Sequence, residues 1–329
     1  MNILHICLEF DCAGVAWNLA QAINSTTSDN ARHVMRRKTH AAANTDFLFE
    51  DAHELLPHLQ WADVLHFHQW IWTYTAGALQ KRSIIEFDST SEQYVEKDSG
   101  IFKSFLKEKK VAFHFHGGHL QLQPQYWIDR CAEVGATMFT CDPLADLPGA
   151  CWMPNVLDSI AVEIAPKRGD LLPFVEGKMP IAVMGDLSDT RRNNKHIKQV
   201  LDHLGINSAF FGTIPRAESF RMRRNFPISI DNITQGFIGM WGWESLVMGH
   251  VLLARIAPAA KNAYERLGPS CPIVHVENVN DIGQKVLELQ KDMSHFIELS
   301  LRGRSWMKQY YNAQKIANMY IKEYHDINS

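Results

Sequence analysis

The sequence has 329 residues, which is long for one hydrophobic core and suits two domains of ordinary size. Hydrophobic residues make up 46% and charged residues 21%, which excludes a disordered, collagen-like or disulfide-rich chain. The formal net charge of −3 gives no general attraction to nucleic acid or to an anionic membrane. Six scattered cysteines indicate a reduced, cytoplasmic chain, and no window approaches the roughly 18 apolar residues that a membrane span needs.

The first half of the chain alternates short apolar runs with helical patterns. Residues 3–7 predict a strand, and after a glycine-containing turn the apolar spacing over 16–23 predicts a helix. Further strands are predicted at 64–67, 111–115 and 137–140, each followed by polar or glycine-bearing residues. This alternation predicts a parallel sheet covered by helices.

A second such unit follows a break in the pattern. Prolines and glycines between Pro166 and Pro180 interrupt both periodicities, so a domain boundary is expected near residue 160. The alternation then resumes with predicted strands at 181–184, 209–211, 228–230, 251–254 and 273–276. An apolar stripe from Tyr310 to Tyr324 predicts a terminal helix. In folds of this kind, ligands bind at the loops after the strands.

The segment from Asp231 to Ile256, DNITQGFIGMWGWESLVMGHVLLARI, carries the strongest chemical signal. Gly236, Gly239 and Gly242 would let the backbone approach a ligand closely, and the helix that follows would point its first N–H groups at a phosphate. Glu244 on that helix could accept hydrogen bonds from two ribose hydroxyls. The alternative for Glu244 is a solvated or helix-capping carboxylate.

This segment resembles the sugar-nucleotide segment of the glycosyltransferase family 4-like, or group 1, enzymes. Those proteins show an Asp, a Gly-aromatic-aromatic-Gly stretch and then Glu-Ala-Met-Ala-x-Gly before a strand. Asp231, Gly236, Gly239, Glu244 and Ser245 occupy the matching places. The resemblance implies that the last four of these residues bind the donor. Many family members carry a second acid where this chain has Gly236.

Arg192 and Lys195 resemble the family's Arg-x-x-Lys-Gly stretch, whose two cations hold the donor diphosphate, although His196 replaces the glycine. A planar guanidinium and a compact ammonium together can offset the charge that builds on a departing nucleoside diphosphate. The alternative is a solvated basic turn, because charge clusters usually lie at the surface.

Matches in the first half run in the family's order. His116 ends an apolar strand at the position of the histidine that reaches the transferred sugar, and His119 replaces the usual acid. Gly14 lies in the first glycine loop, beside the acceptor and phosphates. Pro154 and Asp158 belong to a Pro-Asn-x-x-Asp hinge.

The resemblance covers nearly the whole chain and implies an α/β fold of the GT-B type, in which two Rossmann-like doubly wound domains face each other across a cleft. We expect an acceptor-side domain at 1–160, a nucleotide-sugar domain at 161–304 and a helix at 305–329 that returns to the first domain. The implied activity is a retaining, metal-independent glycosyl transfer that uses a nucleotide-diphosphate-sugar as co-substrate and no cofactor.

The acceptor is the least defined part of this prediction. Polysaccharides and lipid-linked glycans are typical acceptors in the resembled family, which implies glycan biosynthesis at the cytoplasmic face of a membrane with peripheral membrane contact. A modified base of viral DNA is the alternative acceptor, although the charge composition does not favour nucleic acid. His68, Trp70 and His119 are acceptor-side candidates, although tryptophans such as Trp70 and Trp72 more often serve packing.

Two other functions compete with glycosyl transfer. His66-x-His68 and His114-x-His116 each end a predicted strand, as in some metal-dependent hydrolases, and H-x-H spacing sends both side chains to one face. Such a site needs carboxylate ligands as well. The nearby candidates are Asp63 and Asp142. The second alternative is a non-catalytic nucleotide-sugar or saccharide-binding protein with the same fold.

Overall fold

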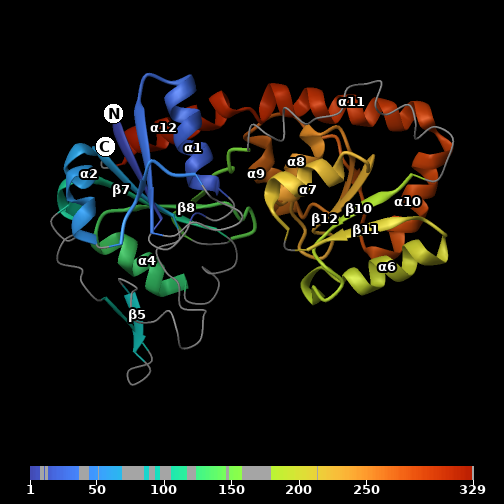
Figure 1. Cartoon of the computed structure of the whole chain (residues 1–329), viewed down its shortest axis with the longest axis horizontal. Coiled ribbons are helices and arrows are strands. Elements are labelled where there is room, and N and C mark those ends of the chain that lie inside the picture. The colour runs from blue at the N-terminus through green and yellow to red at the C-terminus, as the bar shows by residue number, and fades with distance from the viewer. Residues whose placement is uncertain are drawn as a thin grey trace. The chain divides into compact units, whose positions relative to one another are not determined.

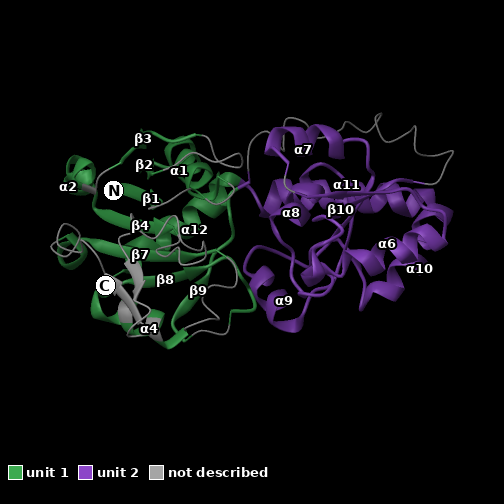
Figure 2. Cartoon of the chain, turned by 60° about the horizontal axis from the view of Figure 1, so that its bottom comes forward, with its two compact units in different colours: residues 1–156, 313–329 green, residues 157–312 purple. Residues whose placement is uncertain are grey.

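The computed structural model describes residues 1–7, 11, 14–36, 44–50, 52–68, 85–88, 93–96, 105–116, 124–145, 148–157, 179–212 and 214–327. The chain forms two compact units (Figure 2). Unit 1 contains Met1–Val156 and Ala313–Ser329, and unit 2 contains Leu157–Asn312. The chain therefore leaves unit 1 close to residue 160 and re-enters it at Ala313, later than the expected residue 305.

Unit 1 is built on a seven-stranded sheet with the order β3-β2-β1-β4-β7-β8-β9. Its strands are β1 (Asn2–Cys7), β2 (Asn30–Met35), β3 (Phe47–Leu48), β4 (Val64–His68), β7 (Lys110–Phe115), β8 (Thr137–Thr140) and β9 (Ala150–Trp152). All neighbouring strands run parallel. In sequence order this is the arrangement 3-2-1-4-5-6 of dinucleotide-binding folds with one further strand at the edge. A separate antiparallel pair joins β5 (Ile85–Asp88) to β6 (Gln93–Glu96).

Helices cover both faces of this sheet (Figure 1). On one face α1 (Val15–Thr26) packs against α12 (Ala313–Asp326), which brings the end of the chain next to its beginning. The apolar positions of α12 explain why it docks, because Ile316, Ala317, Tyr320 and Tyr324 are buried. The other face packs against the 3-10 turn η2 (Ala52–Leu55), α2 (Leu56–Trp61) and α4 (Pro124–Glu133), and the apolar core lies there.

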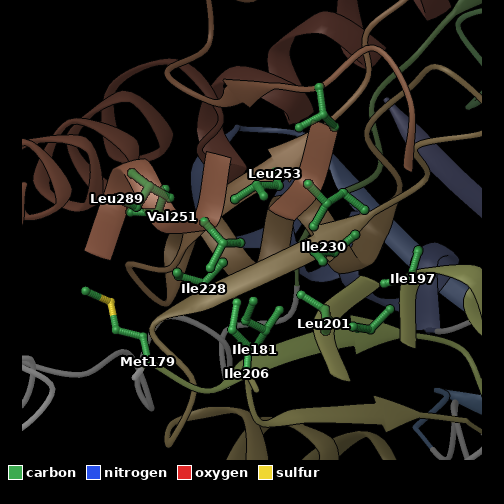
Figure 3. Close-up of a cluster of buried hydrophobic side chains, with 14 of the residues drawn as sticks. Met179, Ile181, Ile197, Leu201, Ile206, Ile228, Ile230, Val251, Leu253 and Leu289 are labelled. Atoms are coloured by element: carbon green, nitrogen blue, oxygen red, sulfur yellow. The ribbon is translucent and has the colours of Figure 1, made fainter. Parts of the chain in front are cut away.

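Unit 2 has a five-stranded parallel sheet with the order β11-β10-β12-β13-β14. Its strands are β10 (Ile181–Met184), β11 (Ser208–Phe211), β12 (Ile228–Asp231), β13 (Val251–Ala254) and β14 (Val274–His275). Its helices are α6 (Asn194–His203), α7 (Arg216–Arg223), α8 (Met240–Val247), α9 (Pro258–Glu265), α10 (Val279–Lys291) and α11 (Met293–Tyr310). Aliphatic side chains from the central strands meet those of α6 and α10 in one cluster (Figure 3).

A strand is found at each of the predicted places, although β14 covers only two of the residues predicted at 273–276. The terminal helix differs from its prediction. Instead of one helix through Tyr310, α11 ends there and α12 starts at Ala313. The side-chain amide of Asn312 donates to the carbonyl oxygens of Lys308 and Gln309, at 3.1 and 3.3 Å, and so closes the end of α11. Because α11 packs on α8, this interruption separates a helix of unit 2 from a helix of unit 1.

None of the described helices has the length and apolar character needed to cross a lipid bilayer.

Candidate functional site

A cavity of about 390 Å³ lies at one edge of the unit 2 sheet. Its walls come from the loops that follow β10, β12, β13 and β14. They include Asn193, His196, Thr234, Arg255, Glu277 and Asn278. In sequence order these strands are arranged 2-1-3-4-5, so the connections diverge between β10 and β12. Open α/β sheets bind ligands at such a point, beyond the carboxyl ends of their strands.

The sequence did not single out these wall residues except His196, although it did predict their strands. Arg255 directly follows β13, and Val276 alone separates Glu277 from β14. Their place directly after a predicted parallel strand was the available signal, because the carboxyl ends of parallel strands share one edge. It could not say which of the loops come close enough to enclose a cavity.

The loop after β10 is fixed by a buried amide. Gly185 leaves the strand with φ of 85°, a left-handed conformation that favours glycine. The side chain of Asn194 donates to the carbonyl oxygens of Met184 and Asp186, at 2.9 and 2.8 Å. This loop therefore holds the start of α6 against the end of β10.

The two predicted diphosphate ligands lie on this loop, next to the cavity residues Asn193 and His196. Arg192 forms an ion pair with Asp189, and its Nε is buried without a hydrogen-bond partner among the described residues. Lys195 is exposed in the first turn of α6. Both cations thus lie on the loop whose residues Asn193 and His196 line the cavity.

The glycine-rich loop after β12 encloses a carboxylate of the chain itself. One oxygen of Asp231, Oδ2, accepts from the backbone N–H groups of Gly239 and Gly242, at 2.8 and 3.2 Å. These amides belong to the cap and first turn of α8. The sequence predicted that this first turn would face a phosphate. In the structure two of its amides are instead taken by Asp231, because a buried carboxylate needs donors of its own.

Close packing explains why Gly242 is a glycine. A Cβ at this position would lie 2.6 Å from both Asp231 Oδ2 and Ile238 Cγ2. Gly236 has φ of 80°, and its own N–H donates to the carbonyl oxygen of Asn232 at 3.1 Å. The glycines of this segment therefore allow the loop to wrap around Asp231 and Asn232. Their predicted contact with a donor stays a prediction.

Glu244 lies in a buried network of opposite charges. Its Oε1 accepts from Arg216 at 2.7 Å, and its Oε2 accepts from Arg223 at 2.8 Å. Arg223 is fully buried, with its guanidinium carbon 3.6 Å from the ring centre of Trp241. Burial lowers the pKa of Arg223 from its ordinary value, against the opposing effect of Glu244. Glu244 is therefore neither a solvated nor a helix-capping carboxylate.

Ser245, the other predicted donor contact on α8, belongs to the same network. Its hydroxyl is fully buried, accepts from Arg223 at 2.6 Å and donates to the carbonyl oxygen of Trp241 at 2.7 Å. A carboxylate offers about four acceptor positions, so two remain on Glu244 after the arginines are counted. The structure thus leaves Glu244 some capacity for a ribose, whereas both roles of the Ser245 hydroxyl are already used.

In unit 1 the candidate histidines form a polar layer on one face of the sheet. Strand alternation separates them from the apolar face, to which Leu65, Phe67 and Phe113 belong. The histidines of this layer are His5 on β1, His66 and His68 on β4, and His114 and His116 at the end of β7. Strand register explains their proximity, because His5 pairs with His66, and His68 pairs with His114.

Hydrogen bonds connect these rings to one another and to α12. His68 Nε2 lies 3.0 Å from His5 Nδ1, and His68 Nδ1 lies 3.1 Å from His116 Nε2. His66 Nδ1 lies 2.6 Å from the hydroxyl of Tyr324. The two predicted sugar-side and acceptor-side histidines, His116 and His68, are therefore direct neighbours.

Burial keeps these imidazoles neutral. Desolvation, with a smaller effect of His33, lowers the pKa of His5 to about 3. Desolvation and the neighbouring histidines also hold the pKa values of His66, His68 and His114 well below the ordinary value. At neutral pH each of these four rings therefore offers one N–H donor and one lone pair.

Gly14, the predicted residue of the first glycine loop, caps α1 with φ of 70°. The carboxylate of Asp11 accepts from the backbone N–H groups of Ala16 and Trp17, at 3.0 and 2.8 Å. The start of α1 is thus closed by the chain's own acid. The predicted residues Trp70, Trp72, His119 and Asp158 lie outside the described residues.

The carboxylate ligands of the hydrolase alternative are not found with the histidines. Asp63 precedes β4, at the opposite end of the strand from His68, and accepts from the backbone N–H of Asn2 at 2.8 Å. Asp142 accepts from the backbone N–H of Leu144 at 2.9 Å. Within the described part of the chain, neither belongs to a group of side chains able to share a metal ion. The sequence-based expectation that Asp63 or Asp142 completes a hydrolase metal site with the histidines is therefore wrong.

Asp231→Asn should change how stability depends on pH. Burial raises the pKa of Asp231 to about 6, from an ordinary value of 3.8. Between these values the folded chain holds a proton that the unfolded chain has lost, so this group's contribution to stability falls as pH rises. Relative to wild type, Asp231→Asn should gain on the order of 3 kcal/mol between pH 4 and 7, in urea unfolding at each pH. The control Asp202→Asn, on the exposed face of α6, should show the same dependence of unfolding free energy on pH as wild type. If Asp231→Asn also shows the wild-type dependence, the raised pKa of Asp231 is contradicted.

Arg223→Met should destabilise unit 2 by about 3–5 kcal/mol, because it leaves the buried Glu244 carboxylate without its innermost partner. Urea unfolding followed by tryptophan fluorescence measures this change. The matched control is Arg224→Met, at the exposed neighbouring position, which should change stability by less than about 0.5 kcal/mol. Equal stability of the two variants would show that the network does not hold α7 to α8.

Neither a protein-family model nor a curated protein sequence matches this chain. Solved structures do match along its whole length. The Anabaena protein HepE in complex with UDP has a TM-score of 0.64 at 10% identity, over 99% of this chain and 100% of that one. A glycosyltransferase from Rickettsia africae has a TM-score of 0.59 at 12% identity, over 100% and 99% of the two chains.

A UDP-GlcNAc 2-epimerase from Neisseria meningitidis, bound to UDP-GlcNAc, has a TM-score of 0.54 at 10% identity, over 99% of this chain and 100% of that one. At these identities the likeness establishes the fold, and the same fold serves more than one reaction. The two parallel sheets with flanking helices, matched over the whole chain, show that this protein has the GT-B fold.

Proposed function

We propose that this protein is a glycosyltransferase that moves a sugar from a nucleoside diphosphate donor to a hydroxyl acceptor, with retention of configuration and without a metal ion at the diphosphate. The observation that carries the proposal is the polar cavity at the switch point of unit 2, bordered by the loop of Arg192 and Lys195. The fold is shared with glycosyltransferases, and the structure of HepE with UDP supports a nucleotide ligand.

The donor's nucleoside would enter the cavity. Glu277 supplies a carboxylate there, and its partner His275 lies at the surface, 3.0 Å from Oε1. A carboxylate can accept hydrogen bonds from both hydroxyls of a ribose, and these bonds are stronger than those to a neutral side chain. Glu277 is thus a second candidate for the ribose contact beside Glu244, whose oxygens already accept from two arginines.

The diphosphate would bind to Arg192 and Lys195. Bond breaking at the anomeric carbon leaves negative charge on the departing nucleoside diphosphate, while the acceptor oxygen forms the new bond and passes its proton to that diphosphate. The guanidinium of Arg192 and the exposed ammonium of Lys195 can offset that charge. Two cations at this place make a metal ion at the diphosphate unnecessary. His116, at the end of β7, is the proposed sugar-side residue of unit 1.

Arg192→Ala and Lys195→Ala should each lower the rate of donor cleavage by roughly a hundred- to a thousandfold, the effect of losing about 3–4 kcal/mol of charge stabilisation. Release of nucleoside diphosphate from a donor panel that starts with UDP-glucose measures the rate. Lys198→Ala is the matched control, because Lys198 is a second lysine of α6 whose ammonium already pairs with Asp202 at the surface. Turnover of both variants within a few-fold of wild type would contradict the diphosphate site.

Glu277→Gln should weaken UDP binding by about ten- to a hundredfold, the range expected when a hydrogen bond to a charged group is lost. Calorimetric titration with UDP measures the affinity. His275→Gln removes the partner of Glu277 and keeps its charge, so it should bind UDP nearly as wild type does. If Glu277→Gln binds normally and Glu244→Gln does not, the ribose contact belongs to Glu244.

The same assays separate the transferase from a non-catalytic binder. A binder would hold UDP-sugars tightly and release no nucleoside diphosphate with any acceptor. The acceptor class, whether a polysaccharide, a lipid-linked glycan or a modified base of DNA, follows from the mass of the trapped product.

A further inference from the structure

Three histidines of the polar layer in unit 1 have the arrangement of metal ligands. His5 lies on β1, and His66 and His68 lie on the neighbouring strand β4. Each ring offers a nitrogen, and these nitrogens all lie within 4.8 Å of one another. All three side chains are buried, so water does not compete freely for them.

The ring nitrogens cannot all be satisfied by one another. A neutral imidazole has one donor and one acceptor. His5 Nε2 and His66 Nε2 are buried without a hydrogen-bond partner in the described part of the chain. An unmet polar atom of this kind costs about 1–3 kcal/mol. Protons on His5 Nε2, His66 Nδ1 and His68 Nδ1 leave the lone pairs at His5 Nδ1, His66 Nε2 and His68 Nε2. An ion bound by these three atoms would satisfy His66 Nε2.

We propose that His5, His66 and His68 bind a divalent transition-metal ion of the zinc class. With metal–nitrogen bonds of about 2.0–2.1 Å, two ligands of a tetrahedral ion lie roughly 3.3 Å apart. The separation of His5 Nδ1 and His68 Nε2 is 3.0 Å, a hydrogen-bond distance that would lengthen slightly when both nitrogens bind one ion. His66 supplies the third nitrogen, within 4.8 Å of the other two.

The nitrogens on the far side of two rings have partners of the kind that orient metal ligands. His66 Nδ1 lies 2.6 Å from the hydroxyl of Tyr324 on α12. His68 Nδ1 lies 3.1 Å from His116 Nε2. A metal-bound histidine usually donates its other N–H to such a neighbour, which fixes the tautomer that leaves the ligating lone pair free.

A second set, His68, His114 and His116, has similar spacing. It shares His68 with the first set, so one ion at His68 Nε2 leaves the second set incomplete. The outer contact of His114 is also weaker, because its Nδ1 lies 3.4 Å from the hydroxyl of Tyr320. The first set is therefore the better site.

Three neutral imidazoles select the ion and suggest its role. Imidazole ligands suit zinc, copper and nickel, whereas magnesium and calcium prefer oxygen. The ion would tie β1, β4 and, through Tyr324, the terminal helix α12 together. The proposed diphosphate ligands belong to unit 2, whereas the ion would lie in unit 1, where its ligand His68 contacts His116, the proposed sugar-side residue.

Metal content tests the proposal. Full-length protein is stripped with a chelator, titrated with Zn²⁺ against a chromophoric competitor, and analysed by mass spectrometry of the metal. Wild type should bind one ion per chain, and Zn²⁺ should raise its melting temperature. His5→Gln and His66→Gln should bind at least about tenfold more weakly. His250→Gln removes a buried histidine of unit 2, bonded to Ser229, and should bind as wild type does.

Two further results decide the site even if a variant fails to fold. Co²⁺ added to the wild type should give the visible absorption of a nitrogen-ligated tetrahedral ion, which needs no substitution. His114→Gln should keep the ion. Loss of the ion in His114→Gln with retention in His5→Gln would move it to the second set and overturn the assignment. Wild type that takes up neither Zn²⁺ nor Co²⁺ would overturn the proposal, whatever the outcome of the UDP and donor-cleavage assays.

Discussion

The carboxyl ends of parallel strands all reach one edge of their sheet, and this constraint determines where each unit can carry chemistry. In unit 2 the loops after β10, β12, β13 and β14 meet at that edge and enclose the cavity. In unit 1 the same edge carries His68 and His116, at the ends of β4 and β7. Both faces of each sheet are covered by helices, so polar groups that do not reach the edge must find partners inside.

Buried charges and polar rings therefore occupy hydrogen-bonding groups that a ligand could otherwise contact. Asp11 closes the start of α1, and Asp231 closes the start of α8. Glu244 is held by Arg216 and Arg223. In the proposed complex a donor phosphate would meet side-chain cations rather than the amides of α8, so the charges of Arg192 and Lys195 would carry a large share of its binding.

The same demand for partners explains the histidine layer. Strand alternation places His66 and His68 of β4 on the face that α1 and α12 cover, and strand register adds His5 of β1 and His114 of β7 beside them. Apolar residues at these positions would pack without cost, whereas imidazoles need hydrogen bonds or a metal ion. The hydroxyls of Tyr320 and Tyr324 on α12, at the far end of the sequence, are hydrogen-bond partners for two of these rings.

The sequence by itself determined the fold class and the central strands, because apolar runs with β-spacing between helical patterns leave little choice of sheet type. It also identified the charged loop at Arg192 and the glycine-rich loop at Gly236. It missed β2, whose NARHVM mixes polar and apolar residues without a regular period, and the short edge strands β3 and β9, and it joined α11 to α12 across Asn312. Only the tertiary structure decided which loops enclose the cavity, that Asp231 and two arginines occupy groups expected to face a donor, and that five histidines from three strands share one layer. These are contacts between residues far apart in sequence, and local periodicity carries no information about which partner a buried charge or ring will find.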